Sequence, residues 1–266
     1  MFDFIEYSNA RCAQLRIVCT GRVGGVSSAP YVSLNLGQHV GDSVKDVHQN
    51  RTKVESHLGL ERSILWLNQT HSVDLVNAKE VRAAFELGDD PLDADGFLCD
   101  EALQPCGILT ADCLPLVIST ADASRFVVLH VGWKGLANGI VEAGVASLLG
   151  QGSLSSEGSL STKDSLWAWA GPCIGPSAFE VGQEVRDALQ GPDSAWTQGR
   201  MDGAEPKWFC DLYALVGHRL AVVGVKQYEH AQACTFTQAD KYFSYRRDGV
   251  TGRQATIVWR SNTRAG

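Results

Sequence analysis

Apolar and polar residues follow one another along the chain in patterns that predict both strands and helices. Short apolar runs predict buried strands over residues 15–20, 64–67, 126–131, 166–170 and 255–259. Apolar residues at helical spacing predict helices that start near Ser43, Gly132, Phe179 and Asp211. Strands and helices mix without a regular cadence, and no glycine-rich nucleotide-binding motif is present. The pattern therefore argues against a dinucleotide-binding or P-loop fold.

The stretch from Gly107 to Gly139 places reactive side chains at the ends of apolar runs. Two such runs flank Thr-Ala-Asp-Cys, which ends at Cys113, and a third run contains His130 at its end. These runs predict a hairpin or two neighbouring central strands. His71 follows another apolar run, inside Asn-Gln-Thr-His-Ser, and is the best third member of this reactive group.

Two further segments are predicted to be turns or loops. Residues 150–165, GQGSLSSEGSLSTKDS, are rich in Gly and Ser and predict a mobile surface insertion, because strand-like sequence resumes at Leu166. Residues 89–96 carry four acids, but without the spacing of a calcium loop. We expect a polar turn there, with Asp95 supporting the reactive group.

Composition and charge narrow the class of protein. The 266 residues are 44% hydrophobic and 20% charged, which suits one soluble domain over residues 1–266. The net charge of -7 and the lack of a Lys/Arg block argue against a nucleic acid partner. No apolar run could span a membrane and no secretory pattern opens the chain, so we expect a cytoplasmic protein. Eight cysteines without a CxxC pair fit free thiols in that compartment, and we expect a monomer.

The reactive group supports two kinds of chemistry. His71, Cys113 and His130 suit a zinc ion that keeps one position open, where the metal would activate water. Spacings of 42 and 17 residues have little specificity alone, and a buried structural cysteine with loop histidines would give the same pattern. A metal-free alternative has Cys113 as thiolate nucleophile, His130 as base and the glycine-rich turn after His130 as oxyanion hole. That scheme leaves His71 without a role.

Two cations are candidates for anion binding. Arg51 falls on the apolar stripe of the predicted helix that starts near Ser43. Its stem could pack while its head reaches water, or it could clamp an anion. Lys134 lies in Gly-Trp-Lys-Gly, where a helix N-terminus would also attract an anion.

A series of motifs resembles the laccase-domain or polyphenol oxidase family, also known as peptidoglycan editing factor or multi-substrate purine nucleoside phosphorylase. The motifs occur in order from about residue 10 to 260, and that order makes the resemblance highly specific. They are Ser-Leu-Asn-Leu-Gly, Val-Gly-Asp, Asn-Arg, Gln-Thr-His-Ser, Thr-Ala-Asp-Cys-Leu-Pro, His-Val-Gly-Trp-Lys-Gly-Leu, Gly-Pro-Cys-Ile, Phe-Glu-Val-Gly, Phe-Ser-Tyr-Arg-Arg-Asp and Thr-Gly-Arg-Gln.

The resemblance implies a fold and a set of site residues. The fold is a single α+β domain with four αββα layers, distantly similar to cysteine-type toxin deamidases. The resemblance also implies zinc held by the residues that match His71, Cys113 and His130, and these three are the catalytic candidates. It implies substrate-pocket positions at Asn35, Arg51 and Gln69. Lys134 stands where the family usually has Arg, which weakens bidentate anion binding at that position.

The function that we expect is a zinc-dependent enzyme acting on purine nucleosides. The resemblance implies phosphorolysis of adenosine, inosine, guanosine and methylthioadenosine, with phosphate as second substrate, and deamination of adenosine. Three alternatives stay open: a peptidoglycan-precursor hydrolase at the same site, a copper-dependent polyphenol oxidase, and a structural metal module. Multicopper oxidation needs several linked metal centres, and seven histidines without a His-x-His pair cannot easily supply them.

Overall fold

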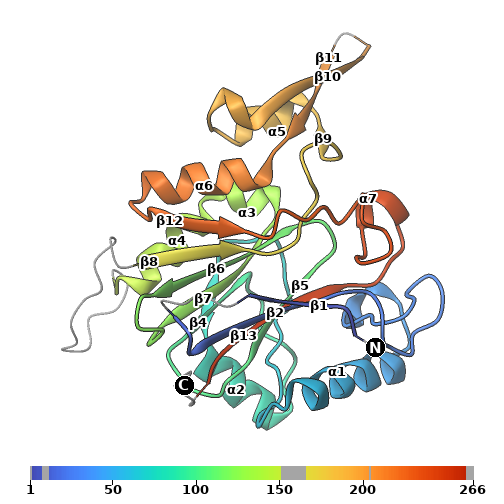
Figure 1. The fold of residues 1–266 in the computed structure, drawn as a ribbon, viewed down its shortest axis with the longest axis vertical. Helices are drawn as coiled ribbons and strands as arrows, with labels where there is room; N and C mark the ends of the chain where they lie inside the picture. The colour runs from blue at the N-terminus through green and yellow to red at the C-terminus, as the bar shows by residue number, and fades with distance from the viewer. Residues whose placement is uncertain (1, 8–11, 151–165, 204, 262–266) are drawn as a thin grey trace.

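The computed structural model describes residues 2–7, 12–150, 166–203 and 205–261, and it contains three sheets with helices packed around them (Figure 1). The predicted insertion therefore lies, beyond Gly150, outside the described residues. The largest sheet has six strands in the order β12-β8-β6-β7-β4-β3. In that order the strands span Gln227–His230, Leu166–Ala170, Leu114–Thr120, Phe126–Val131, Gly96–Cys99 and Leu75–Asn77.

The second sheet has four strands in the order β1-β2-β13-β5 and joins the two ends of the chain. These strands span Phe4–Tyr7, Leu15–Thr20, Gln254–Arg260 and Cys106–Thr110. β13 pairs antiparallel with β2 on one side and with β5 on the other. The third sheet, β10-β11-β9, forms the projecting end of the molecule in Figure 1. Its strands span Trp196–Asp202, Glu205–Cys210 and Glu180–Val181.

Helices pack against the sheets. The α-helices α1 to α7 span Val44–Leu58, Ala78–Leu87, Trp133–Asn138, Ile140–Leu148, Gln183–Ala188, Leu212–Val222 and Tyr245–Asp248. The 3-10 helices η1 and η3 span Gln38–Val40 and Asp193–Ala195. α4 and α6 lie along one side of the six-stranded sheet, and α1 and α2 lie at the opposite end of the molecule (Figure 1).

Three buried apolar clusters hold these elements together. One cluster joins β6, β7 and β8 to α3, α4 and α6 through side chains that include Leu129, Val141 and Leu215. The second lies between the two large sheets and includes Phe97 and Trp169. The third joins the four-stranded sheet to α1 through side chains that include Ile257 and Val54. The reactive group predicted from the sequence thus stands on a well-packed framework.

Most of the predicted elements are present. The strands predicted over 15–20, 126–131 and 166–170 are β2, β7 and β8, and β13 contains the strand predicted over 255–259. Ser43 caps α1 by accepting the Asp46 N–H, and Asp211 caps α6 by accepting the Ala214 N–H. β6 and β7 form the predicted neighbouring pair. The α+β class is confirmed, and the four-layer arrangement stays an expectation.

Three predicted elements are wrong in extent. Residues 64–67 form no strand, because only Leu65 makes a bridge, to Cys106. The helix predicted after Gly132 is divided into α3 and α4 by Gly139, whose φ of 96° terminates α3 in the left-handed region that suits glycine. The helix predicted near Phe179 begins only at Gln183, because residues 180–181 pair with β11. Sheet pairing overrides the helical spacing there.

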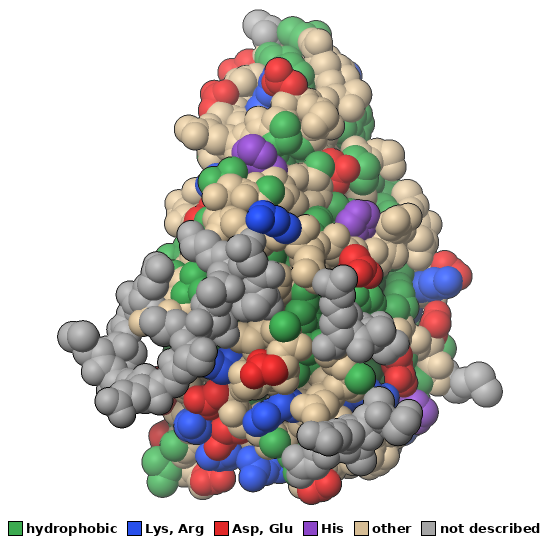
Figure 2. Space-filling view, turned by 60° about the vertical axis from the view of Figure 1, so that its left-hand side comes forward, with side chains coloured by type: hydrophobic (Ala, Val, Ile, Leu, Met, Phe, Trp, Pro, Cys, Tyr) green, Lys and Arg blue, Asp and Glu red, His purple; other side chains and the backbone are tan. Residues whose placement is uncertain are grey.

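The acidic segment over residues 89–96 is irregular rather than the predicted turn: Asp93 forms an isolated bridge with Asn68, and the segment ends where β4 begins at Gly96. On the face seen in Figure 2, acidic and basic side chains are interspersed rather than separated by sign. Within the described ranges, no helix has both the length and the apolar character needed to cross a bilayer.

Candidate metal centre

His71, Cys113 and His130 come together from three parts of the chain. His130 lies on β7 opposite Pro115 of β6, and Cys113 lies in the turn between β5 and β6. His71 lies in the loop that precedes β3. One ligand atom from each side chain lies within 4.8 Å of the other two, and Cys113 Sγ is 3.9 Å from His71 Nε2. The structure therefore assembles the three residues that the sequence singled out.

The spacing of these atoms fits one small metal ion. Bonds of about 2.3 Å from zinc to sulfur and about 2.0 Å to nitrogen place tetrahedral ligand atoms about 3.5 Å apart. The 3.9 Å between Cys113 Sγ and His71 Nε2 is close to that spacing. His130 is buried, Cys113 is partly buried and His71 is exposed. The group is therefore open on the side of His71, where a substrate could approach.

Gly132, directly after β7, permits the close approach of these side chains. A Cβ at this position would lie 2.7 Å from His71 Cδ2 and 3.3 Å from Cys113 Sγ. His71 and Asp112 themselves have positive φ angles of 62° and 97°, which side-chain-bearing residues adopt at an energetic cost. The surrounding contacts hold both residues in these conformations, as is common at functional sites.

Asp95 holds both histidines in place. Its Oδ1 is 2.7 Å from His130 Nδ1, and its Oδ2 accepts hydrogen bonds from the backbone and hydroxyl groups of Thr70 and Ser72, which flank His71. The side chain is completely buried. This contact engages Nδ1 of His130 and leaves Nε2 for a metal. The supporting role expected for Asp95 is therefore consistent with its contacts.

The charges of Cys113 and His130 depend on each other. Burial alone would raise the pKa of Cys113, but His130 and His71 outweigh that effect and lower it to about 6. Burial alone would lower the pKa of His130, but Cys113 and Asp95 raise it to about 9. In the metal-free protein at neutral pH the pair is a thiolate and an imidazolium. A metal ion would find its sulfur ligand already deprotonated and would displace a proton from His130.

We expect Cys113 to be the fastest-reacting cysteine of the metal-free protein. Its rate of alkylation by iodoacetamide should rise to half its maximum near pH 6, because its pKa is about 6 and the thiolate is the nucleophile. Stoichiometric zinc should suppress this reaction. Peptide mass mapping over a series of pH values measures the rate, and Cys113→Ser supplies the baseline. A rate that rose only around the usual thiol pKa of about 8.5 would contradict the assigned thiolate.

A cavity of about 390 Å³ opens onto the three residues, which is within the range of small-molecule pockets. His39, Tyr245 and Arg253 line it and were not predicted as site residues. The complete lining is His39, Gln69, His71, Leu109, Thr110, Ala111, Cys113, His130, Tyr245 and Arg253. Partial desolvation, together with the charges of Arg253 and Arg51, lowers the pKa of His39. These effects favour the neutral imidazole form of His39 over the imidazolium form in the cavity.

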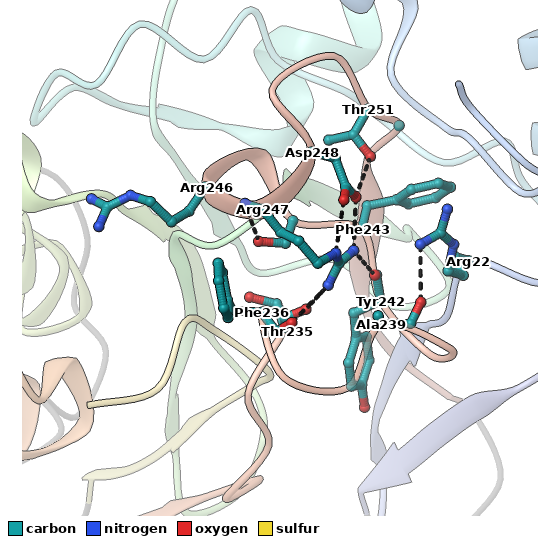
Figure 3. Close-up of polar contacts among 12 residues, drawn as sticks. Arg22, Thr235, Phe236, Ala239, Tyr242, Phe243, Arg246, Arg247, Asp248 and Thr251 are labelled. Atoms are coloured by element: carbon teal, nitrogen blue, oxygen red, sulfur yellow. Dashed lines mark hydrogen bonds and ion pairs between the residues drawn. The ribbon is translucent and has the colours of Figure 1, made fainter. Parts of the chain in front are cut away.

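Arg247 anchors the helix that brings Tyr245 to this cavity. Figure 3 shows its guanidinium pointing into the loop that precedes α7, whereas Arg246 points away. The partners of the Arg247 side chain are the carbonyl oxygens of Thr235, Phe236 and Tyr242 and the carboxylate of Asp248. These contacts satisfy carbonyl groups that the loop leaves without partners in a strand or helix. α7 is therefore firmly held.

Asp112 connects α7 to the candidate metal ligand that follows it. Its two carboxylate oxygens accept hydrogen bonds from Thr235 Oγ1 at 2.6 Å and from the backbone N–H of Arg246 at 2.7 Å. Its carbonyl oxygen accepts the Ile174 N–H at 2.9 Å. Cys113 and the cavity wall carrying Tyr245 are thereby fixed relative to each other.

Two of the predicted substrate-binding residues lie at or next to this cavity. Gln69 lines it, but both ends of its side-chain amide bond the backbone of Leu109 at 2.8 Å. Asn35 is buried behind the wall, where its Oδ1 accepts the N–H groups of Gly37 and Arg253. These contacts position the wall, and direct substrate binding by the two residues stays a prediction.

The structure does not bring Arg51 and Lys134 to the lining of this cavity. Arg51 donates twice to the Leu36 carbonyl and lies over the Trp66 ring, where it borders a separate cavity of about 280 Å³. Lys134 is exposed, with Nζ 5.8 Å from the Trp133 ring centre. α3, which begins at Trp133, has only six residues. Anion binding by either cation stays a prediction.

Comparison with known proteins identifies related chains along nearly the whole sequence. A family model described as multi-copper polyphenol oxidoreductase laccase matches residues 16–261. A purine nucleoside phosphorylase of Pseudomonas aeruginosa is 39% identical over 93% of this chain and 94% of its own. The Escherichia coli purine nucleoside phosphorylase YfiH is 35% identical over 90% of both chains.

Solved structures agree with this relationship. A Neisseria meningitidis protein matches with a TM-score of 0.82 at 35% identity, covering 97% of this chain and 99% of that one. YlmD from Geobacillus stearothermophilus matches with a TM-score of 0.82 at 28% identity, covering 96% of this chain and 94% of that one. The sheets that carry the candidate metal centre therefore belong to a shared fold.

Proposed function

The chain belongs to the multi-copper polyphenol oxidoreductase laccase family, as its motifs predicted, and from this premise we propose that it is a zinc-dependent enzyme acting on purine nucleosides. The reactions are phosphorolysis of adenosine, inosine, guanosine and methylthioadenosine, and deamination of adenosine. The observation that carries this proposal is the cluster of His71, Cys113 and His130 at the cavity. The names of relatives that are 35% and 39% identical support the substrate class.

The donor set favours zinc over copper. Three protein ligands with one open position are typical of catalytic zinc sites, and both imidazole and thiolate are common ligands of zinc. A blue-copper site has the same three donors but adds a weak axial ligand, usually methionine. Met201, the methionine within the described ranges, lies on the β10 strand in the projecting sheet. Those ranges hold one cluster of potential metal ligands, whereas multicopper oxidation needs several.

The residues around the cavity would have different roles in such a reaction. His71, Cys113 and His130 would hold the metal, which supplies Lewis-acid polarisation of the substrate when bound. His39 lines the cavity and could exchange a hydrogen bond or a proton with the substrate through its imidazole nitrogens. Tyr245, 61% exposed, presents an aromatic ring at the cavity that suits stacking on a purine. α7 and Asp112 keep that ring in place relative to Cys113.

We expect zinc-loaded protein to convert adenosine to adenine only when phosphate is present, and to inosine whether or not phosphate is present. Mass spectrometry of the products separates the two reactions, because phosphorolysis also yields ribose 1-phosphate. Protein loaded with copper in place of zinc is the metal control. Absence of both products from zinc-loaded protein would refute the proposed function, and oxidation of a phenol only after copper loading would favour the oxidase alternative.

A further inference from the structure

Arg253 is the arginine that lines the cavity together with the candidate metal ligands. Among the described residues of the lining, none is a lysine and no other is an arginine. In the described part of the chain, no carboxylate lies within ion-pair distance of its guanidinium. Arg253 shares this property with Arg22, Arg51 and Arg125, whose side chains donate to backbone carbonyl groups, but of these arginines only Arg253 lines the cavity. The guanidinium is partly buried, and its hydrogen-bond partners are neutral carbonyl groups. Desolvation lowers the pKa of Arg253, and the negative charges of Cys113 and Asp112 offset this effect only in part. This position therefore favours an anion from outside the protein.

Hydrogen bonds fix the orientation of the Arg253 guanidinium. Nη1 donates to the carbonyl oxygens of Thr251 at 3.1 Å and Gly252 at 3.0 Å, which occupies both of its hydrogens. No described residue accepts a hydrogen bond from Nε or Nη2. These two nitrogens form the edge that binds an oxyanion through two parallel hydrogen bonds. The edge suited to bidentate binding is therefore available.

The rest of the residue is held equally firmly. The backbone N–H of Arg253 donates to Asn35 Oδ1 at 2.8 Å. A Cβ added to Gly37 would lie 2.8 Å from Arg253 Cγ, so the side-chain stem packs directly against the backbone before η1. The Tyr245 ring centre is 6.0 Å from the guanidinium carbon. A cation that is ordered before the ligand arrives loses little entropy on binding.

We propose that Arg253 binds the phosphate co-substrate through its Nε–Nη2 edge, in the same cavity as the candidate metal ligands. This inference rests on the proposed function, which needs phosphate near the ribose. It moves the anion-binding role from Arg51 and Lys134, which do not line the cavity, to a residue from the C-terminal part of the chain. Arg51 instead supports the backbone at Leu36, close to the turn that carries His39.

Calorimetric titration of zinc-loaded protein with inorganic phosphate tests the proposal without requiring turnover. Arg253→Gln should weaken phosphate binding about 10- to 100-fold, because it removes charge-assisted hydrogen bonds. Arg253→Lys should recover only part of the loss, because an ammonium lacks the planar fork. Arg246→Gln is the matched control: the Arg246 side chain donates to the Glu180 carbonyl and does not line the cavity. Zinc content and melting temperature must match wild type in each variant.

Three results would overturn the proposal. The first is a phosphate affinity that is unchanged in a folded, zinc-loaded Arg253→Gln variant. The second is an about 10- to 100-fold loss of phosphate affinity that occurs in Arg51→Gln and not in Arg253→Gln. Binding of adenosine 5′-monophosphate but not of inorganic phosphate would mean that the arginine recognises a nucleotide rather than a co-substrate. Failure of the proposed function looks different: wild type would bind phosphate in an Arg253-dependent manner and yet leave adenosine intact.

Discussion

Replacing Cys113 by alanine should remove the metal and turnover together. The substitution deletes the one sulfur ligand of a three-residue set and leaves two imidazoles, of which His71 is exposed. Residues that only orient a metal ligand typically contribute about 10- to 100-fold to affinity or activity, so we expect a loss of more than about 100-fold for a ligand itself. Metal analysis after dialysis and assays of adenosine conversion measure the two quantities.

Cys234→Ser is the matched control for this variant. Cys113 and Cys234 are the two partly buried cysteines, and Cys234 contributes no atom to the metal-ligand cluster. Serine at this position should therefore leave metal content and turnover near wild type. Full metal content with lost turnover in Cys113→Ala would indicate a nucleophilic cysteine. Full metal content with full turnover would refute a role for Cys113 in the site.

The local part of the site could be predicted from the sequence. Cys113 and His130 lie on either side of a hairpin, and hairpin strands pair through contacts close in sequence. The apolar runs next to Cys113 and His130 predicted buried strands, and reactive side chains at the ends of buried strands are candidates for a functional site. His71 was identified by its polar surroundings and by the family motif. Its contact with Cys113 depends on a fold that brings segments 42 residues apart together, which no local pattern determines.

The cavity wall could not be predicted in this way. Arg253 reaches the site because β13 inserts between β2 and β5, and its backbone bonds Asn35 from 218 residues away. Periodicity identifies a strand but not its neighbours in a sheet. Tyr245 and Arg253 belong to motifs that carried the family resemblance, yet nothing local distinguished a cavity-lining arginine from its neighbours in those motifs. The same limit applies to Arg51, since a cation on an apolar stripe can either clamp an anion or donate to a backbone carbonyl, as Arg51 does to Leu36.

Replacing Asp95 by asparagine should impair both metal binding and folding. The asparagine side chain could take either of two orientations. With its NH2 group towards Thr70 and Ser72, it would face their N–H groups with another donor. With its NH2 group towards His130, it would donate a hydrogen bond to Nδ1. The second arrangement places the imidazole proton on Nε2, the atom needed for the metal. We expect metal affinity to fall about 10- to 100-fold and the free energy of unfolding to fall by about 3 kcal/mol. Zinc competition titrations and urea unfolding measure these changes.

The pH dependence of the unfolding free energy gives a sharper test, because it separates the effect of the Asp95 charge from other effects of the substitution. Burial alone would raise the pKa of Asp95, but hydrogen bonds from His130 and Ser72 outweigh it and lower the pKa to about 2. The pKa of an aspartate in the unfolded chain is about 3.9. The ionised Asp95 therefore stabilises the folded protein fully above about pH 4, and this stabilisation is lost as the pH falls towards about 2. The difference in unfolding free energy between metal-free wild type and Asp95→Asn should narrow over that range. Asp93→Asn, at an exposed position close to Asp95, should track wild type, because an amide oxygen there can still accept the hydrogen bond from Asn68 Nδ2. A difference that stayed constant across this acidic range would show that the charge of Asp95 does not stabilise the fold.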